Sequence, residues 1–559
     1  MKLKKFLVSS LAFLLLFSAV GCDGKNTGDL EEQKEFSAPY VTAVSESGKG
    51  FIKHGGESVL LLSSQIAADL LIVADGKTPR ELEPYFAVAA ETGFNSVDIP
   101  ILWNQVETEK DVYDSGVIRT YLDFAKKYNL KINLLWYGSL KDGETKGYSL
   151  PEYILENPTD YTVLKDLYDG GVYGRIRIMK WNDKDLLARE SRALYELMNA
   201  IYAWNGENGN YDPVVTLQIG QGTADRFYRW RIDQYKVEGA EGLMTQSEAE
   251  EMIAQYIEAL AAAVKKSAYR PLVRLEFCEQ GAVTEETLRV KNLENVDLIC
   301  PTYLHTVAEN RNGTSNFASD ERLNGMPVIN AENWASDINY RQVLTTIVSG
   351  GIGYNSYLLS PPKYYPMSPN GAIFDRIDDE KETLEEKFVS IGDRSEDTKT
   401  VLSLILNAPY TVSVSSAKNI VALNMNNRLS AGDVQKSYVT YADGDKGVFL
   451  DYVVAEDEKA LGFAAIREID GSVYLYVSAT SNSSIQVSRA NVMIAQKGRE
   501  SASGEWTSEG NVDLAFNNKG IVLEANVLYR LKLSNVEDML SGKELAESGY
   551  ESPLTSLRG

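Results

Sequence analysis

The feature that most constrains the fold is an alternation of short apolar runs with amphipathic segments between residues 59 and 358. The runs lie at Val59–Ser64, Asn95–Leu102, Lys131–Tyr137, Val214–Ile219, Leu272–Phe277, Val296–Tyr303, Pro327–Ala331 and Gly351–Leu358. Several are almost continuously apolar, which is typical of strands buried on both faces of a parallel sheet. We therefore interpret them as eight parallel strands.

The segments between these runs have apolar residues three and four positions apart, which indicates helices. They are Glu81–Thr92, Gly116–Tyr128, Asp185–Trp204, Ser247–Lys266, Glu285–Val290 and Tyr340–Ser349. Alternating strands and helices form right-handed βαβ units, and eight units over about 300 residues favour a closed (β/α)8 TIM barrel of the α/β class. An open doubly wound sheet would be expected to carry a glycine-rich dinucleotide loop after an early strand, and the sequence has none there.

The pattern changes after Leu406, where short runs are separated by turn residues such as Asp470-Gly471. These runs are Val412–Val414, Asn419–Leu423, Tyr438–Tyr441, Gly447–Tyr452, Gly462–Glu468, Val473–Ser478, Gln486–Ala495, Gly520–Leu523 and Leu528–Leu533. They predict a C-terminal all-β sandwich domain. The stretch 138–184, which has no strong period, is expected to be an insertion at the C-terminal face of the barrel.

The N-terminus has the features of an export signal. Three lysines within residues 2–5 precede an apolar run, Phe6–Val20, that is too short for a comfortable membrane span. The run ends Ala-Val-Gly-Cys22, which resembles a bacterial lipobox. The resemblance implies cleavage before Cys22 and lipidation of that residue, which would hold the exported protein on a membrane of the bacterial cell envelope. The alternative is a plain secretory signal with an incidental cysteine, and the protein is exported in both cases.

These observations divide the chain into five parts. We expect a signal peptide at 1–21, a polar tether at 22–45, the barrel at 46–405, the sandwich at 406–536 and a polar tail at 537–559. The chain has 56 Lys and Arg against 79 Asp and Glu, a net charge of −23, which argues against nucleic acid as a partner. Because there are only 3 Cys and 2 His, a dense metal cluster is excluded, and we expect no metal and no other cofactor.

Motifs at the ends of several predicted strands resemble those of a known protein family. The second strand ends in WNQVE (103–107), the third in LLWYGS (134–139) and the seventh in INAENW (329–334), and GFNSV (93–97) precedes the second. Side chains just past the C-terminal ends of barrel strands form the site in proteins of this fold. Together these motifs resemble the clan A glycosidases, in particular the glycoside hydrolase family 35 β-galactosidases and their family 42 relatives, over about residues 50–365.

The resemblance implies a retaining glycosidase, which needs two carboxyl groups about 5–5.5 Å apart. It assigns Glu332 as the nucleophile. The family carries Gln-x-Glu-Asn-Glu at the end of the fourth strand, with the last Glu as acid/base, whereas this chain reads Gln218-Ile-Gly220-Gln-Gly222. A general acid or base contributes about 10²–10⁴-fold, so either another group has taken the role or hydrolysis of unactivated glycosides is severely slowed.

Three carboxyl groups are possible substitutes for the missing acid/base. We name Asp225, three residues after Gly222, and Glu279 and Glu107 remain open as alternatives. The first strand also differs from the family, because Gln65 stands where family 35 typically has Glu.

Residues at the other strand ends would bind the substrate. They are Trp103, Asn104, Glu107, Trp136, Gln218, Gln221, Tyr303, Trp334 and Tyr354. Flat aromatic surfaces pack against sugar rings, so the set favours a neutral, polyhydroxylated ligand. We therefore expect an extracytoplasmic, retaining, β-galactosidase-like hydrolase that acts on β-linked oligo- or polysaccharides with a degenerate acid/base motif. The alternatives are a catalytically impaired glycan-binding protein on the same barrel and a structural surface protein.

Overall fold

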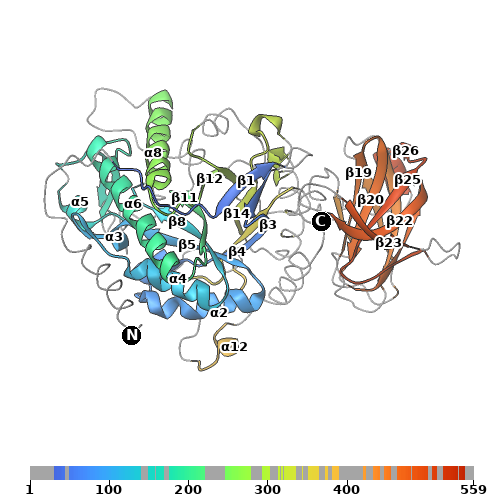
Figure 1. Ribbon diagram of the computed structural model, residues 1–559, viewed down its shortest axis with the longest axis horizontal. Coiled ribbons are helices and arrows are strands. Elements are labelled where there is room, and N and C mark those ends of the chain that lie inside the picture. The colour runs from blue at the N-terminus through green and yellow to red at the C-terminus, as the bar shows by residue number, and fades with distance from the viewer. Residues whose placement is uncertain are drawn as a thin grey trace, which may run out of the picture.

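The protein consists of a helix-flanked barrel and a C-terminal body made of strands, as the computed structural model shows (Figure 1). The structure describes residues 30–44, 50–139, 149–157, 159–168, 175–220, 246–277, 293–302, 313–314, 316–318, 320–334, 343, 346, 350–363, 372–374, 381–388, 420–423, 432, 434–440, 446–454, 462–479, 481–500, 506–512, 520–538 and 540–547.

Eight parallel strands form the barrel. They are β4 (Leu61–Gln65), β5 (Ser96–Leu102), β8 (Lys131–Tyr137), β11 (Val214–Ile219), β12 (Leu272–Phe277), β13 (Leu298–Pro301), β14 (Ile329–Trp334) and β15 (Gly353–Tyr357). Each strand pairs with the next one in chain order, β15 pairs with β4, and bridges from Ile299 to Val328 and from Thr302 to Ala331 join β13 to β14. The sheet is therefore closed, and the predicted TIM barrel is confirmed.

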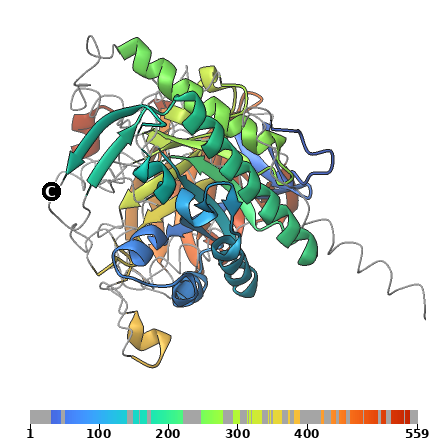
Figure 2. The same cartoon turned by 90° about the vertical axis from the view of Figure 1, so that its left-hand side faces the viewer.

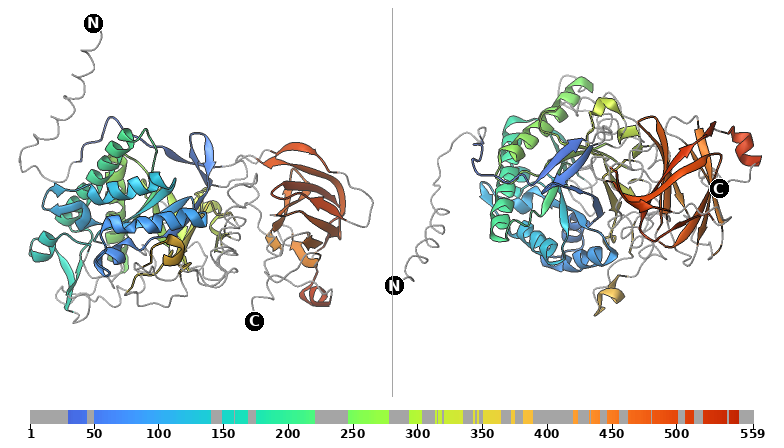
Figure 3. Two further views of the ribbon diagram at one scale, coloured as in Figure 1. Left: turned by 90° about the horizontal axis from the view of Figure 1, so that it is seen from below. Right: turned by 45° about the vertical axis from the view of Figure 1, so that its right-hand side comes forward.

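Helices surround this sheet (Figures 2 and 3). They include α1 (Ala68–Val73), η1 (Pro79–Leu82), α2 (Glu83–Thr92), α3 (Trp103–Val106), α4 (Gly116–Lys127), α5 (Glu152–Glu156), α6 (Lys184–Glu207), α8 (Gln246–Lys266), η2 (Glu321–Leu323) and α12 (Leu384–Lys387). Alternate strand residues such as Val97, Ile99 and Leu134 join the helices' apolar side chains in one buried cluster. The predicted helix Glu285–Val290 and most of Tyr340–Ser349 lie outside the described residues.

Two hairpins decorate the connections between barrel strands. The connection after β5 carries β6 (Glu107–Glu109) and β7 (Val112–Tyr113). The insertion at 138–184 contains α5 and an antiparallel pair, β9 (Val163–Tyr168) and β10 (Arg175–Met179). Sequence periodicity did not reveal this second hairpin.

A small antiparallel sheet closes the N-terminal end of the barrel. It consists of β1 (Tyr40–Val44), β2 (Gly50–His54) and β3 (Glu57–Val59). The side chains of Tyr40, Phe51 and Ile52 are buried in one cluster with residues at the starts of the barrel strands, including Leu61 and Leu272. Residues 40–44, in the range expected to be a tether, thus form a strand, because apolar burial holds them on the barrel.

The C-terminal body has two antiparallel sheets, as predicted. One contains β16 (Ile420–Leu423), β19 (Gly462–Ile469), β20 (Ser472–Ala479), β25 (Leu528–Ser534), β22 (Asn491–Glu500) and β23 (Trp506–Asn511). The other contains β17 (Val434–Thr440), β18 (Lys446–Val454), β21 (Ser483–Ser488) and β24 (Ile521–Leu523), with β26 (Glu537–Asp538) beside β18. Side chains from both sheets, such as Leu450 and Leu475, share one buried core.

Two details of the C-terminal body differ from the sequence interpretation. The run Gln486–Ala495 is not one strand, because Arg489 has a left-handed φ of 67° and the chain reverses between β21 and β22. Strand β23 lies in a polar stretch that gave no apolar signal. The predicted tail contains β26 and the short helix α14 (Gly542–Glu547).

Candidate active site

The inward-facing side chains of the barrel form layers, and each layer takes its members from alternate strands. The strand registers give three successive polar or mixed layers. From the N-terminal end upward, these are Ser63, Asn133, Arg274 and Ile329; then Asp98, Gln218, Cys300 and Asn355; then Gln65, Leu135, Glu276 and Ala331. Charged and amide side chains thus occupy the upper part of the barrel interior, where the C-terminal ends of the strands lie.

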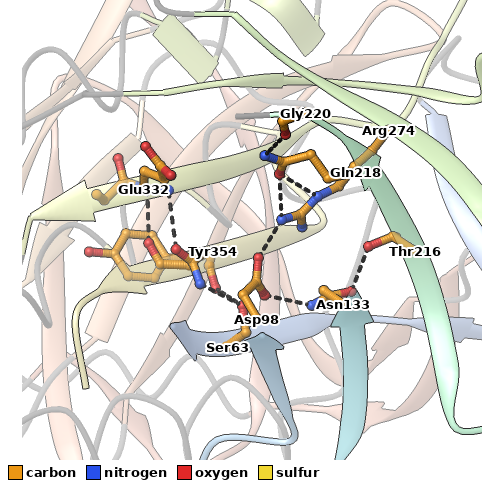
Figure 4. A network of polar contacts seen from close by, with 11 residues as sticks. Ser63, Asp98, Asn133, Thr216, Gln218, Gly220, Arg274, Glu332 and Tyr354 are labelled. Atoms are coloured by element: carbon orange, nitrogen blue, oxygen red, sulfur yellow. Dashed lines mark hydrogen bonds and ion pairs between the residues drawn. The ribbon is translucent and has the colours of Figure 1, made fainter. Parts of the chain in front are cut away.

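A buried ion pair lies at the centre of these layers (Figure 4). The guanidinium of Arg274 donates to the carboxylate of Asp98, and it also donates to Gln218 Oε1 from Nε (3.2 Å) and Nη2 (3.0 Å). Asn133 Nδ2 donates to the other Asp98 oxygen at 2.9 Å. Thr216 Oγ1 in turn donates to Asn133 at 2.8 Å. The network connects four adjacent strands, from β5 to β12.

Burial and the charges in this network shift the pKa values of Arg274 and of the neighbouring Cys300. Burial lowers the pKa of Arg274, but the negative charges of Asp98 and Glu276 raise it by more, so the guanidinium remains charged. Burial raises the pKa of the Cys300 thiol to about 12, although Arg274 opposes that shift. Sequence reasoning missed Asp98, Arg274 and Glu276, although charged residues inside apolar runs (SVDIPIL, LVRLEF) are an available signal.

Glu332 lies at the C-terminal end of β14, where the sheet is irregular. The register with β15 shifts between Asn330 and Asn333, and Glu332 has a left-handed φ of 49°. Its N–H donates to Asn355 Oδ1 at 3.1 Å, and the next residue, Asn333, donates from Nδ2 to the Asn355 carbonyl at 3.3 Å (Figure 4). Such a conformation costs a non-glycine residue about 1–2 kcal/mol, and strained backbone of this kind clusters at functional sites.

Glu332 is only 2% exposed. An enclosed carboxylate is shielded from bulk water, which strengthens its electrostatic interactions. A sugar could contact it only after covering atoms shift.

The end of β11 cannot easily carry a carboxylate at the first position of the family motif. Gly220 has a left-handed φ of 70°. Its N–H donates to the Trp136 carbonyl at 3.0 Å, and its own carbonyl accepts from Gln218 Nε2 at 3.0 Å. A side chain at this position would be strained, which gives a physical reason for glycine here. Gln221, Gly222 and Asp225 lie outside the described residues, as do Glu279 and Cys22.

The described aromatic residues expected to bind sugar are packed in the core instead. Trp103 is fully buried, and its Nε1 donates to Glu107 Oε2 at 2.8 Å. Trp136 is also fully buried, and its Nε1 donates to Glu190 on α6 at 2.9 Å. The Tyr354 ring is buried among the apolar residues that face the helices. Strand alternation directs Trp136 and Tyr354 away from the barrel axis. Tyr303 and the Trp334 side chain lie outside the described residues.

Glu107 and Asn104 belong to the packing beside the barrel. Glu107 Oε1 accepts from the N–H of Asp111 at 3.0 Å and lies 3.6 Å from Arg189 on α6. Burial raises the pKa of Glu107, and the hydrogen bonds partly offset that effect. The N–H of Asn104 donates to the Ser149 carbonyl at 2.9 Å. Glu107 is thus separate from the layers that contain Asp98 and Glu276.

A second buried carboxylate, missed by sequence reasoning, organises the end of β8. Glu190 on α6 accepts from Trp136 Nε1, from the Ser139 N–H and hydroxyl, and from the Tyr256 hydroxyl. Gly138 passes so close that an added Cβ would overlap Glu190 Oε1. Burial raises the pKa of Glu190, and the four donors oppose this shift. Nothing in the sequence indicated that Glu190 is buried, because an acidic residue in an amphipathic helix normally faces solvent.

Two further observations concern the described part of the chain. It contains no group of three or more His, Cys, Asp or Glu side chains arranged to hold a metal ion. None of its helices combines the length and apolar character that a membrane span needs.

The fold and site define a (β/α)8 barrel protein with a polar barrel interior and a C-terminal β domain. No protein-family model matches the chain, and no curated protein matches it. Solved structures that it resembles include an exo-β-1,4-mannosidase from Opitutaceae bacterium strain TAV5 (TM-score 0.43, 11% identity, covering 67% of this chain and 63% of that one).

Two β-galactosidases are also similar in structure. The enzyme from the Antarctic haloarchaeon Halorubrum lacusprofundi has a TM-score of 0.42 and 10% identity, covering 63% of this chain and 60% of that one. The enzyme from the psychrophilic Marinomonas ef1 has a TM-score of 0.40 and 9% identity, covering 62% of this chain and 60% of that one. The chain thus spans about three fifths of the length of these glycosidases.

Proposed function

We propose that this protein is a retaining glycoside hydrolase of β-galactosidase-like type that acts on β-linked glycans through Glu332. The observation that supports the proposal most directly is the backbone of Glu332. This residue ends the seventh barrel strand in a left-handed conformation, and Asn355 holds its N–H. Stored strain at the position that the sequence motif assigns to the nucleophile is expected if a precise carboxylate orientation is required.

In this mechanism, the Glu332 carboxylate attacks the anomeric carbon as the bond to the leaving oxygen breaks. Water then hydrolyses the glycosyl-enzyme, and the configuration is retained because two inversions occur. Asn355 accepts from the backbone N–H of Glu332, and Asn333 donates to the Asn355 carbonyl, so these residues fix the backbone that carries the attacking group. The reaction also needs a proton donor for the leaving group, and Gly222, at the position that the family motif gives to the acid/base, carries no side chain that could supply it.

The substrate is proposed to be a neutral sugar. In the described barrel interior, the Arg274 charge is matched by Asp98, while the Glu332 nucleophile adds negative charge. An anionic sugar would be repelled by this excess of carboxyl groups. Hydroxyl groups, in contrast, can exchange hydrogen bonds with amides and carboxylates.

The location proposed for the enzyme is the bacterial cell envelope, with Cys22 as the lipid attachment site. The support is the basic and apolar leader before Cys22 and the lipobox resemblance. In vivo labelling with a palmitate analogue tests the anchor: wild type should be labelled, and a Cys22→Ser variant should not. Labelling of the variant would contradict the assignment.

A second candidate function is glycan binding without turnover. It is favoured by Gly220, which replaces a carboxylate of the family motif, and by the enclosure of Glu332. This candidate predicts saturable binding of oligosaccharides with no release of product.

Assays on a broad panel of aryl β-glycosides distinguish the two candidates. Activated leaving groups need no proton donor, so the wild type should turn over at least one of them, and Glu332→Gln should abolish that turnover. Azide should accelerate wild type if the acid/base is absent. Absence of turnover by wild type on every substrate would refute the hydrolase proposal.

A further inference from the structure

We propose that Glu276, on the fifth barrel strand, is the acid/base that the fourth strand lacks. The inference rests on the proposed function, because it assigns the second carboxyl group of the same reaction. Neither the sequence motif nor the family resemblance points to this residue. Strand register and the layer in which each interior carboxylate lies point to Glu276.

Strand register brings Glu276 to the height of the nucleophile. Glu276 pairs with Cys300 on β13, and Ile299 and Thr302 on that strand bridge to Val328 and Ala331 on β14. In an eight-stranded barrel of shear eight the strands are tilted relative to the barrel axis. From one strand to the next, the residue at the same height therefore lies about one position beyond the paired residue, toward the C-terminal end of the strand. The layer of Glu276 therefore includes Ala331, the residue immediately before Glu332.

The irregularity in β14 then brings Glu332 toward this layer. In a regular strand Glu332 would face the helices, because Ala331 faces inward and is buried in one cluster with Cys300 and Ile329. The register shift between Asn330 and Asn333 and the left-handed φ of Glu332 interrupt this alternation. The N–H of Glu332 donates to the side-chain oxygen of Asn355, a residue that faces the barrel interior. Members of one layer converge on the barrel axis, as a retaining carboxyl pair must.

The other described carboxylate that faces the barrel axis, Asp98, is part of the ion-pair network. One oxygen of Asp98 accepts from Arg274, and the other accepts from Asn133 at 2.9 Å. Both oxygens of Asp98 thus accept from buried donors of the protein, which hold the carboxylate in the network. Asp98 also lies one layer below Glu276. Among the described residues that face the barrel axis, Glu276 is therefore the carboxyl group suited to pair with Glu332.

The proposed reaction is balanced in protons and bonds. In the first step, the Glu276 carboxyl donates its proton to the glycosidic oxygen as the C–O bond breaks and Glu332 bonds to the anomeric carbon. In the second step, the Glu276 carboxylate takes a proton from water while the water oxygen attacks the anomeric carbon. The bond to Glu332 breaks, and both carboxyl groups return to their initial states.

The test compares kcat/KM of wild type, Glu276→Gln and Glu276→Ala on phenyl and 2,4-dinitrophenyl β-glycosides. Loss of an acid/base should lower the phenyl activity by about 10²–10⁴-fold and affect the dinitrophenyl substrate much less. Azide should restore turnover by Glu276→Ala and give a glycosyl azide of retained configuration. Glu57→Gln, an exposed carboxyl variant in the small N-terminal sheet, is the matched control and should behave as wild type.

Other outcomes separate this inference from the proposed function. One such outcome is that Glu332→Gln abolishes turnover while the loss of kcat/KM in Glu276→Ala is the same for both leaving groups. That result would support the hydrolase proposal and refute the role of Glu276. The same conclusion follows if Asp225→Asn shows the leaving-group dependence and azide rescue instead. Lack of turnover by wild type refutes both proposals. Thermal unfolding of the isosteric Glu276→Gln variant shows whether a loss of activity reflects a loss of folding.

Discussion

Inside the barrel, the Arg274 guanidinium on β12 is paired with the Asp98 carboxylate on β5, and both side chains are almost wholly shielded from water. Removal of one partner leaves the other charge buried without compensation, which typically costs about 3–5 kcal/mol. We expect Asp98→Asn and Arg274→Met each to reduce the free energy of barrel unfolding by about this amount, measured by urea denaturation.

The surface pair Arg499 and Glu509 on the C-terminal body provides the control, because both side chains are exposed. Glu509→Gln should change stability by about 1 kcal/mol or less. A loss of similarly small size for Asp98→Asn would show that the barrel interior is well solvated, contrary to the structure.

Glu190 should give the protein a distinctive pH dependence. Burial raises its pKa above that of an unfolded glutamate, so the native state binds its proton more tightly. This contribution to stability is complete below the unfolded pKa of about 4.3 and is lost as the pH rises through the folded pKa. Relative to Glu190→Gln, wild type should therefore lose stability with increasing pH. Equilibrium unfolding of both proteins at several pH values measures this difference, and a constant difference would contradict it.

Gly138 should tolerate no side chain, because an added Cβ overlaps Glu190 Oε1 and comes close to Trp136 Nε1. We expect Gly138→Ala to destabilise the barrel by about 1–3 kcal/mol, the usual range for overpacking. Gly206 on α6 is the matched control, since an added Cβ there meets nothing within 4 Å. Gly206→Ala should be neutral or stabilising by up to about 1 kcal/mol. Equal melting temperatures for the two variants would exclude the overlap.

Cys300 should react slowly with thiol reagents in the native protein. Its side chain is buried, and burial raises the pKa of the thiol to about 12, so very little thiolate exists at neutral pH. Peptide mapping after a timed pulse of iodoacetamide should find Cys300 unmodified in native protein and modified in urea. Rapid native labelling would mean that the barrel interior opens readily.

The sequence predicted the architecture because the architecture depends on local patterns. Parallel strands covered by helices are largely apolar runs, and all eight such runs were correctly assigned. The small N-terminal sheet and the β9–β10 hairpin were not predicted, because they are short and lack a long apolar run. Strand β23 was also not predicted, because most of its residues are polar and exposed.

The candidate site was less predictable, because a side chain's direction depends on single-residue register. Trp136 and Tyr354 end on the helix side of the sheet and not on the barrel axis, although both lie in strands whose positions were predicted correctly. At Glu332, a register shift in β14 and a left-handed φ interrupt the regular alternation of side chains along the strand. No pattern in the sequence specifies such a shift.

The sequence alone therefore determined the number of strands, their order and the presence of charged residues within four of them. Only the tertiary structure decided that Asp98, far along the chain from Arg274 and Glu276, lies in a layer of the interior next to theirs. The physical reason is that closure of the barrel fixes strand tilt and stagger for all eight strands together. Convergence of side chains is thus a property of the closed sheet, whereas apolar periodicity is a property of each segment.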